Sequence, residues 1–242
     1  EEAVQMIRAP AGGMNGGIFP AAEPYPPEKV TDNALAWMAS AHSPFLVRLS
    51  YLQPHTPVLP PEPYARLYED QDWHPLPRVP EGVSAFQKRI AEVHGLDRMD
   101  PDAFRACVLH YYAQVAWVDA QVGRVLDFLE REGRLERTVL VFTSDHGNPL
   151  GDVGQFEKHT FAPSSQRVPM LLSWRGTVPA GRVDDGICES LDLARTFFSA
   201  ASVEAPECFR GRDLLAEPPP EAVYSTIGYG RPFSKMGPNG GR

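Results

Sequence analysis

The chain has 242 residues, of which 43% are hydrophobic and 22% charged, and its formal net charge is −8 at pH 7. This size and balance suit one large domain with a buried core, and they exclude wholesale disorder. The acidic balance argues against a protein that binds nucleic acid, which needs a basic stripe. No apolar run approaches the roughly 20 residues of a membrane-spanning helix.

The cysteines Cys107, Cys188 and Cys208 are too few for a disulfide framework. None of them belongs to a C-x-x-C pair, so we expect no structural zinc site. We expect them instead to be small buried side chains. So few cysteines leave the compartment open, cytoplasmic or periplasmic.

The first fifty residues predict a loop, a short helix and a strand. Residues 1–27 are rich in Gly, Pro and Ala, which indicates loop. Thr31 and Asp32 would cap a short helix over 34–38. The apolar run 44–50 has no helical period and predicts a strand.

A long helix and a second strand follow a Pro-rich excursion. Apolar residues recur at three- and four-residue spacing over 101–132, which predicts a helix that Gly133 ends. The continuous apolar run 138–143 is typical of a strand buried on both faces. With the strand at 44–50, this order predicts a βαβ crossover and therefore a parallel sheet.

Three further elements complete the α/β pattern. We expect a strand over 168–174, a helix over 191–201 and a last strand over 223–227. The sequence therefore predicts an α/β fold, with a mixed, mostly parallel sheet flanked by helices. Long Pro-rich loops, above all 51–82, interrupt it.

Asp145 and His146 come directly after the predicted strand 138–143. In open α/β sheets, ligands bind beyond the carboxyl ends of the strands. A carboxylate followed by an imidazole can present one oxygen and one nitrogen to the same divalent cation, and Gly147 lets the chain turn there. The alternative is a turn with an exposed histidine and no ligand.

His55 and Lys158 are the other candidates for a site. His55 follows the first predicted strand and stands between Pro54 and Pro57, which restrict its loop. Lys158 lies 13 residues after Asp145 and could neutralise charge on a bound anion. Alone, either residue would be an ordinary solvated side chain, so the hypothesis depends on the combination.

The chain resembles the sulfatase family of the alkaline phosphatase superfamily over about residues 28–228. The resemblance rests on four stretches in the family's order: P-H-x-P at 54–57, Y-x-x-x-V-x-x-V-D-x-x-V-G at 111–123, T-S-D-H-G-x-x-L-G with K-H-T and R-V-P over 143–169, and D-L with G-R-x-L-L over 192–215. The third stretch is specific, and the others support it.

The resemblance implies an alkaline-phosphatase-like fold and metal-dependent hydrolysis of sulfate esters. Asp145 and His146 match the family's metal ligands, for which Ca²⁺ is expected and Mn²⁺ is the alternative. His55 matches the residue that touches the transferred group or the leaving oxygen. Lys158 matches the residue that binds the sulfuryl or phosphoryl oxygens, and His159 is a weaker substrate-binding candidate.

Two family features have no match in this chain. These are the strand that ends in paired acidic residues and the C-x-P-x-R motif, or its Ser variant, whose cysteine becomes the nucleophilic formylglycine. Cys208 begins a C-x-x-x-R spacing, but Arg210 interrupts the pattern and the stretch falls in the late G-R-x-L-L region. We therefore expect no nucleophile in this chain.

These departures predict that residues 1–242 are the C-terminal part of an incomplete catalytic domain, with 229–242 as loop or tail. Formylglycine would lie in an N-terminal segment of the same protein, and we expect the isolated chain to be inactive. The partners expected are that segment and a small-molecule ester, with an oligomer left open.

Two alternatives to a sulfatase remain from the sequence. One is a phosphonate monoester or phosphodiester hydrolase of the same superfamily, which would prefer Mn²⁺ because imidazole is a softer ligand than an amide oxygen. The other is a catalytically incomplete homologue that acts as a binding or assembly module. The sequence does not identify the exact substrate.

Overall fold

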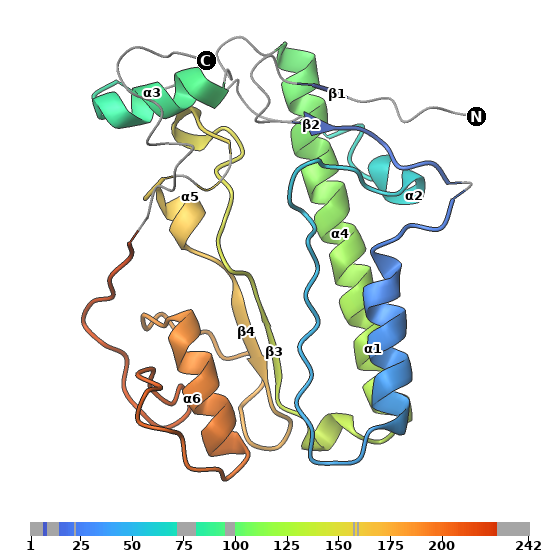
Figure 1. Ribbon diagram of the computed structural model, residues 1–242, viewed down its shortest axis with the longest axis vertical. Helices are drawn as coiled ribbons and strands as arrows, with labels where there is room; N and C mark the ends of the chain where they lie inside the picture. The colour runs from blue at the N-terminus through green and yellow to red at the C-terminus, as the bar shows by residue number, and fades with distance from the viewer. Residues whose placement is uncertain are drawn as a thin grey trace. The chain divides into compact units, whose positions relative to one another are not determined.

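The computed structural model describes residues 7–8, 15–21, 23–71, 81–94, 100–156, 158 and 160–226 (Figure 1). The chain divides into two compact units. The first comprises Glu1–Thr138 and Asn148–Glu157, and the second comprises Val139–Gly147 and Lys158–Arg242. Each unit is built from two separate segments, so the chain passes between them three times. Within the described residues, no helix has the length and apolar character needed to span a membrane.

Helix α4 (Pro101–Arg131) forms the centre of the first unit and confirms the helix predicted over 101–132. The Asp100 carboxylate accepts a hydrogen bond from the Ala103 backbone N–H at 3.0 Å, which caps the first turn. The buried face of α4 is mostly apolar and includes Cys107 and Trp117, together with the buried side chains of Gln114 and Gln121. Helix α1 (Glu28–Ser40) contacts α4 and runs beside it in Figure 1.

Helix α1 begins six residues before the predicted start, so the expected cap at Thr31 and Asp32 is wrong. Both residues lie inside the helix and bind α4 instead. The Thr31 hydroxyl donates to Gln121 Oε1 at 2.9 Å, and Asp32 pairs with Arg124 at 2.6 Å. Their polar groups thus connect two helices and do not cap one.

The strand predicted over 44–50 is not formed. The segment forms no backbone–backbone hydrogen bond with another described residue, and Leu46 is 70% exposed. A strand requires a partner ladder, and the described part of the chain supplies none here. The remaining elements of this unit are β1 (Ile7–Arg8) paired antiparallel with β2 (Asn15–Gly16), α2 (Glu62–Ala65), α3 (Ala85–His94), η2 (Leu135–Arg137) and η3 (Asp152–Gly154).

The second unit contains strands β3 (Leu140–Thr143) and β4 (Met170–Ser173), which confirm the strands predicted at 138–143 and 168–174. They pair antiparallel. The predicted crossover from 44–50 to β3 is not formed, because 44–50 is not a strand. Burial of β3 on both faces is also wrong. Phe142 and Leu171 lie opposite each other in a sheet of two described strands, and they are 38% and 62% exposed.

Helix α6 (Ser190–Ala200) confirms the predicted helix over 191–201. A capping box fixes its first turn: the Glu189 side chain accepts from the N3 backbone, and the Asp192 side chain accepts from the Glu189 N–H. The last predicted strand is not present over 223–226, and residues 227–242 lie outside the described part of the chain.

The apolar core of the first unit lies along α4 and reaches the loop that carries His55. One cluster comprises Val58, Phe104, Cys107, Val108 and Phe156, and a second comprises Tyr25, Trp117 and Val118. Val58 is fully buried and follows His55 by three residues. Packing on α4 therefore fixes one end of this loop.

Candidate functional site

The Asp145–His146 turn directly follows β3 and presents two potential ligand atoms together. Asp145 Oδ1 accepts hydrogen bonds from the His146 backbone N–H at 3.0 Å and from the Ser144 hydroxyl at 3.3 Å. The other carboxylate oxygen, Oδ2, lies 3.6 Å from His146 Nε2. The side chains are 83% and 37% exposed respectively, so both atoms are accessible.

A backbone contact fixes which nitrogen of His146 can bind a ligand. His146 Nδ1 lies 2.9 Å from the Gly147 carbonyl oxygen. A carbonyl can only accept, so Nδ1 carries the proton and the lone pair is on Nε2, beside Asp145. Metal-bound histidines commonly show this arrangement, with the second ring N–H donated to a carbonyl.

The Asp145–His146 pair fits part of a cation's ligand shell. Metal–ligand distances of about 2.0–2.6 Å allow two donor atoms 3.6 Å apart to bind one ion. No third His, Cys, Asp or Glu joins them within the described residues. Since a hard cation takes about six or more ligands, this pair would supply a minority of them.

The backbone of helix α5 (Pro163–Gln166) holds the turn in place. The Gly147 N–H donates to the Ser165 carbonyl at 2.7 Å, and a Cβ on Gly147 would collide with the Ser164 carbonyl oxygen. The sequence predicted that Gly147 allows a turn, but it did not reveal this close approach. A glycine is therefore required here by a neighbouring chain segment.

His55 belongs to the first unit and lies in a tight turn. Its backbone N–H donates to the Leu52 carbonyl at 2.9 Å. Its Nδ1 lies 2.6 Å from the Thr56 carbonyl oxygen, which places the proton on Nδ1 and the lone pair on Nε2. The imidazole is exposed, as a residue that contacts a substrate should be.

Lys158 belongs to the second unit and is half-buried. Its carbonyl accepts from the Thr160 N–H at 2.8 Å, which closes a turn in the K-H-T stretch. His159 lies outside the described residues. The structure thus brings Asp145 and His146 together, whereas the roles of His55 and Lys158 stay predictions.

The cysteines divide into two kinds. Cys107 is fully buried, and burial raises the pKa of its thiol to about 12, so it behaves as the expected small apolar residue. The same expectation is wrong for Cys188 and Cys208, which are exposed. Cys188 lies just before α6, where its sulfur contacts the sulfur of Met170 at 3.7 Å.

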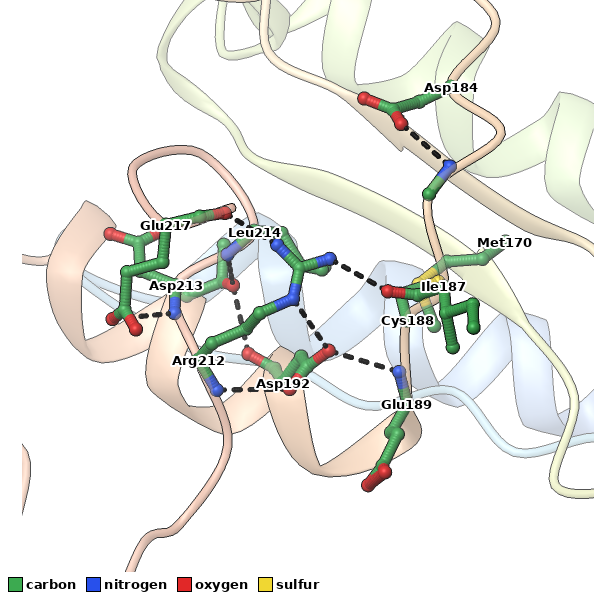
Figure 2. Close-up of polar contacts among 12 residues, drawn as sticks. Met170, Asp184, Ile187, Cys188, Glu189, Asp192, Arg212, Asp213, Leu214 and Glu217 are labelled. Atoms are coloured by element: carbon green, nitrogen blue, oxygen red, sulfur yellow. Dashed lines mark hydrogen bonds and ion pairs between the residues drawn. The ribbon is translucent and has the colours of Figure 1, made fainter. Parts of the chain in front are cut away.

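The late C-x-x-x-R stretch has a structural task that the sequence did not reveal. The Arg212 N–H donates to Asp192 Oδ1 at 2.9 Å, and its guanidinium donates to the carbonyls of Ile187 and Glu217 (Figure 2). A Cβ on Gly211 would collide with a carbonyl oxygen of α6. These contacts tie the loop to the start of α6, which agrees with a stretch that supplies no nucleophile.

Comparison with known proteins identifies the family. A family model described as Sulfatase matches residues 8–203, well over half of the chain. The chain belongs to the sulfatase family. The four sequence stretches that predicted this membership all overlap the matched region, and the prediction is confirmed.

Curated sulfatase relatives are considerably longer than this chain. It is 31% identical over 186 residues to an arylsulfatase of Clostridium perfringens, a match that covers 72% of this chain and 38% of the relative. It is 28% identical over 204 residues to the multifunctional alkaline phosphatase superfamily protein PehA of Trinickia caryophylli, covering 76% and 40%. The sulfatase chain thus spans about two fifths of the length of these relatives.

Solved structures confirm the predicted alkaline-phosphatase-like fold class. The phosphonate monoester hydrolase of Silicibacter pomeroyi matches with a TM-score of 0.67 and 27% identity, over 80% of this chain and 42% of that one. A protein solved with its substrate D-glucosamine-2-N,6-O-disulfate matches with a TM-score of 0.69 over 79% and 51%. Its 22% identity shows the shared fold alone.

Proposed function

We propose that the whole protein hydrolyses sulfate esters with a bound divalent cation, and that this chain supplies part of the site. One observation carries the proposal: Asp145 Oδ2 and His146 Nε2 lie side by side, with His146 Nδ1 directed to a carbonyl. Membership of the sulfatase family supports sulfate as the transferred group.

Asp145 and His146 would hold the cation, for which we propose Ca²⁺, with Mn²⁺ as the alternative. The carboxylate contributes a hard oxygen, and His146 contributes Nε2 in the tautomer that its Gly147 contact fixes. When bound, the cation neutralises charge on the transferred group. We propose that the remaining ligands come from the paired acidic residues of the family, which this sequence does not match, and no other candidate ligand joins the pair within the described residues.

His55 and Lys158 would act on the substrate itself. His55, with its Nδ1–H held by the Thr56 carbonyl, would take up a second proton on Nε2 from solvent, deliver it to the leaving oxygen and return to the Nδ1–H tautomer. The Lys158 ammonium would bind the sulfuryl oxygens and stabilise their developing charge. His159 would contribute a weaker substrate contact. We assign no nucleophile to this chain and propose formylglycine in the N-terminal part of the protein.

We further propose that residues 1–242 are inactive alone. Two ligands hold a hard cation weakly, and the sequence contains no C-x-P-x-R motif. The unpaired segment 44–50 and the exposed Phe142–Leu171 pair are apolar surfaces that the rest of a catalytic domain would cover. Robust turnover of an aryl sulfate by the isolated chain would contradict this.

The decisive experiment measures p-nitrophenyl sulfate hydrolysis by the whole protein. Asp145→Asn and His146→Gln should each lower kcat/KM by at least about a hundredfold, and chelation should abolish activity until the cation is restored. Asp184→Asn, which changes an exposed carboxylate of the second unit, is the matched control and should leave activity unchanged. Full activity of the Asp145→Asn protein would refute the assignment.

A second candidate is hydrolysis of phosphonate monoesters or phosphodiesters. The match to the phosphonate monoester hydrolase of Silicibacter pomeroyi favours it. Turnover of p-nitrophenyl sulfate and of a phenyl phosphonate ester, each with Ca²⁺ and with Mn²⁺, separates the two activities. Absence of turnover with both esters would favour a catalytically incomplete homologue that binds or assembles.

A further inference from the structure

The hydroxyl of Tyr25 binds the end of the loop that carries His55. It donates to the Leu59 carbonyl at 2.9 Å, four residues after His55. Tyr25 is itself buried and lies far from this loop in the sequence. One hydroxyl group therefore fixes the end of the loop.

Aromatic packing on helix α4 supports both sides of this loop. The ring of Tyr25 lies edge-on to Trp117, with centroids 5.0 Å apart, and the ring of Tyr51 lies edge-on to Trp117 at 5.7 Å. Tyr51 precedes His55, whereas Tyr25 binds the segment that follows it. Trp117 is fully buried in α4, so it gives both tyrosines a rigid support.

Gln114, one turn before Trp117 on α4, orients the Tyr25 hydroxyl. Its Nε2 donates to the Tyr25 oxygen at 3.4 Å, and its side chain is almost fully buried. Its Oε1 has no hydrogen-bond partner among the described residues. Burial of a side-chain amide whose acceptor oxygen has no partner is unfavourable. The hydrogen bond from Gln114 to the Tyr25 hydroxyl is therefore the interaction that offsets this cost.

We propose that Tyr25, oriented by Gln114, is a positioning residue for His55. The contact between His55 Nδ1 and the Thr56 carbonyl requires one backbone conformation of the turn, and the Tyr25 hydroxyl holds the segment that follows that turn. Loss of the hydroxyl would release the imidazole from its single tautomer. The inference rests on the proposed function only where it assigns His55 to the leaving oxygen.

The test is ¹⁵N long-range NMR of the His55 imidazole in the 242-residue chain, with His55→Gln to assign its signals. The parent chain should show the Nδ1–H tautomer. Tyr25→Phe, which keeps the ring and removes the hydroxyl, should shift the nitrogens toward a mixture of tautomers. Gln114→Met should shift them less and in the same direction, and circular dichroism checks that each variant folds.

Tyr51→Phe is the matched control. It removes a hydroxyl that contacts Thr31 at 2.8 Å, and it preserves the ring against Trp117. The His55 signals of this variant should match the parent. Identical signals in the parent and Tyr25→Phe would overturn the proposal, and so would an equal shift in Tyr51→Phe, because a general loosening of the unit would then explain the effect.

Kinetics of the whole protein add a second readout. Tyr25→Phe should lower kcat about ten- to a hundredfold, as misplacement of a catalytic group does, with KM changed less than about twofold. An unchanged kcat would overturn the positioning role. If the parent protein turns over neither ester class, the proposed function fails, and the tautomer measurement still decides the role of Tyr25.

Discussion

Asp192 and Arg212 form an ion pair at the start of helix α6, although they lie 20 positions apart in the sequence. Arg212 Nε lies 3.5 Å from Asp192 Oδ2, and the two side chains are 15% and 7% exposed. The same carboxylate accepts from the backbone N–H groups of Glu189 and Arg212. Asp192 thus caps the helix and binds the loop at once (Figure 2).

Arg212→Ala should lower the free energy of unfolding by about 3 kcal/mol, because it leaves the Asp192 carboxylate buried without its charged partner. Urea denaturation followed by circular dichroism measures the change. Arg182→Ala, which removes the exposed pair with Asp184, is the control and should leave stability within error. Equal losses of unfolding free energy in both variants would show that the buried Arg212–Asp192 pair stabilises the chain no more than the exposed Arg182–Asp184 pair does.

Gly147→Ala should destabilise the second unit by about 1–3 kcal/mol, since the added methyl group overlaps the Ser164 carbonyl oxygen. The matched change Gly123→Ala meets no atom within 4 Å and lies inside helix α4. It should stabilise the chain by up to about 1 kcal/mol, because alanine is the better helix former. Thermal unfolding of both variants checks the opposite signs, and a stable Gly147→Ala protein would contradict the close approach.

Stability should fall in mild acid because of His110. Burial lowers the pKa of this imidazole below its ordinary 6.5, and its Nδ1 has no hydrogen-bond partner in the described part of the chain. Above pH 6.5 the group is neutral in both states. Below this pH the unfolded chain takes up the proton first, so the free energy of unfolding decreases until the lowered folded pKa is reached.

His110→Gln should flatten that pH dependence, since glutamine does not titrate. Urea denaturation at several pH values between about 7 and 4.5 compares the variant with the parent. His55→Gln is the control, because it removes a histidine that is exposed. An undiminished slope in His110→Gln would show that other groups cause the acid sensitivity.

The sequence predicted helices well where their signals are local. Helix α4 has an Asp100 cap, a proline in its first turn and a continuous apolar period, and α6 has its capping box within four residues. Helix α1 was misjudged because Thr31 and Asp32 resemble a cap by composition. Their true partners, Gln121 and Arg124, lie about ninety residues away.

Strands were harder to predict because their pairing is not local. The runs at 138–143 and 168–174 do form strands, but neither run indicates its partner or the orientation of the pair. The run at 44–50 has strand composition and no ladder within the described residues. Composition therefore predicted the extended conformation, whereas hydrogen bonding between distant segments decided the sheet.

The candidate metal ligands were predictable because Asp145 and His146 are adjacent in one turn. The carbonyl groups that constrain this turn were not, since Ser164 and Ser165 reach Gly147 through the fold. The Tyr25 contact with the His55 loop was missed for the same reason. Sequence identified the residues proposed for the chemistry, and the structure identified what supports them.

Because each unit combines two separate segments of the chain, the order of synthesis decides when all the residues of a unit are available to fold. Segment Val139–Gly147 belongs to the second unit, yet it is synthesised before Asn148–Glu157, which belongs to the first. The first unit therefore cannot be completed on the ribosome until part of the second has already emerged. A single proteolytic cut or a simple gene truncation also cannot separate the two units, because any fragment that contains one whole unit also carries a segment of the other, so dissecting this protein requires a redesigned connection.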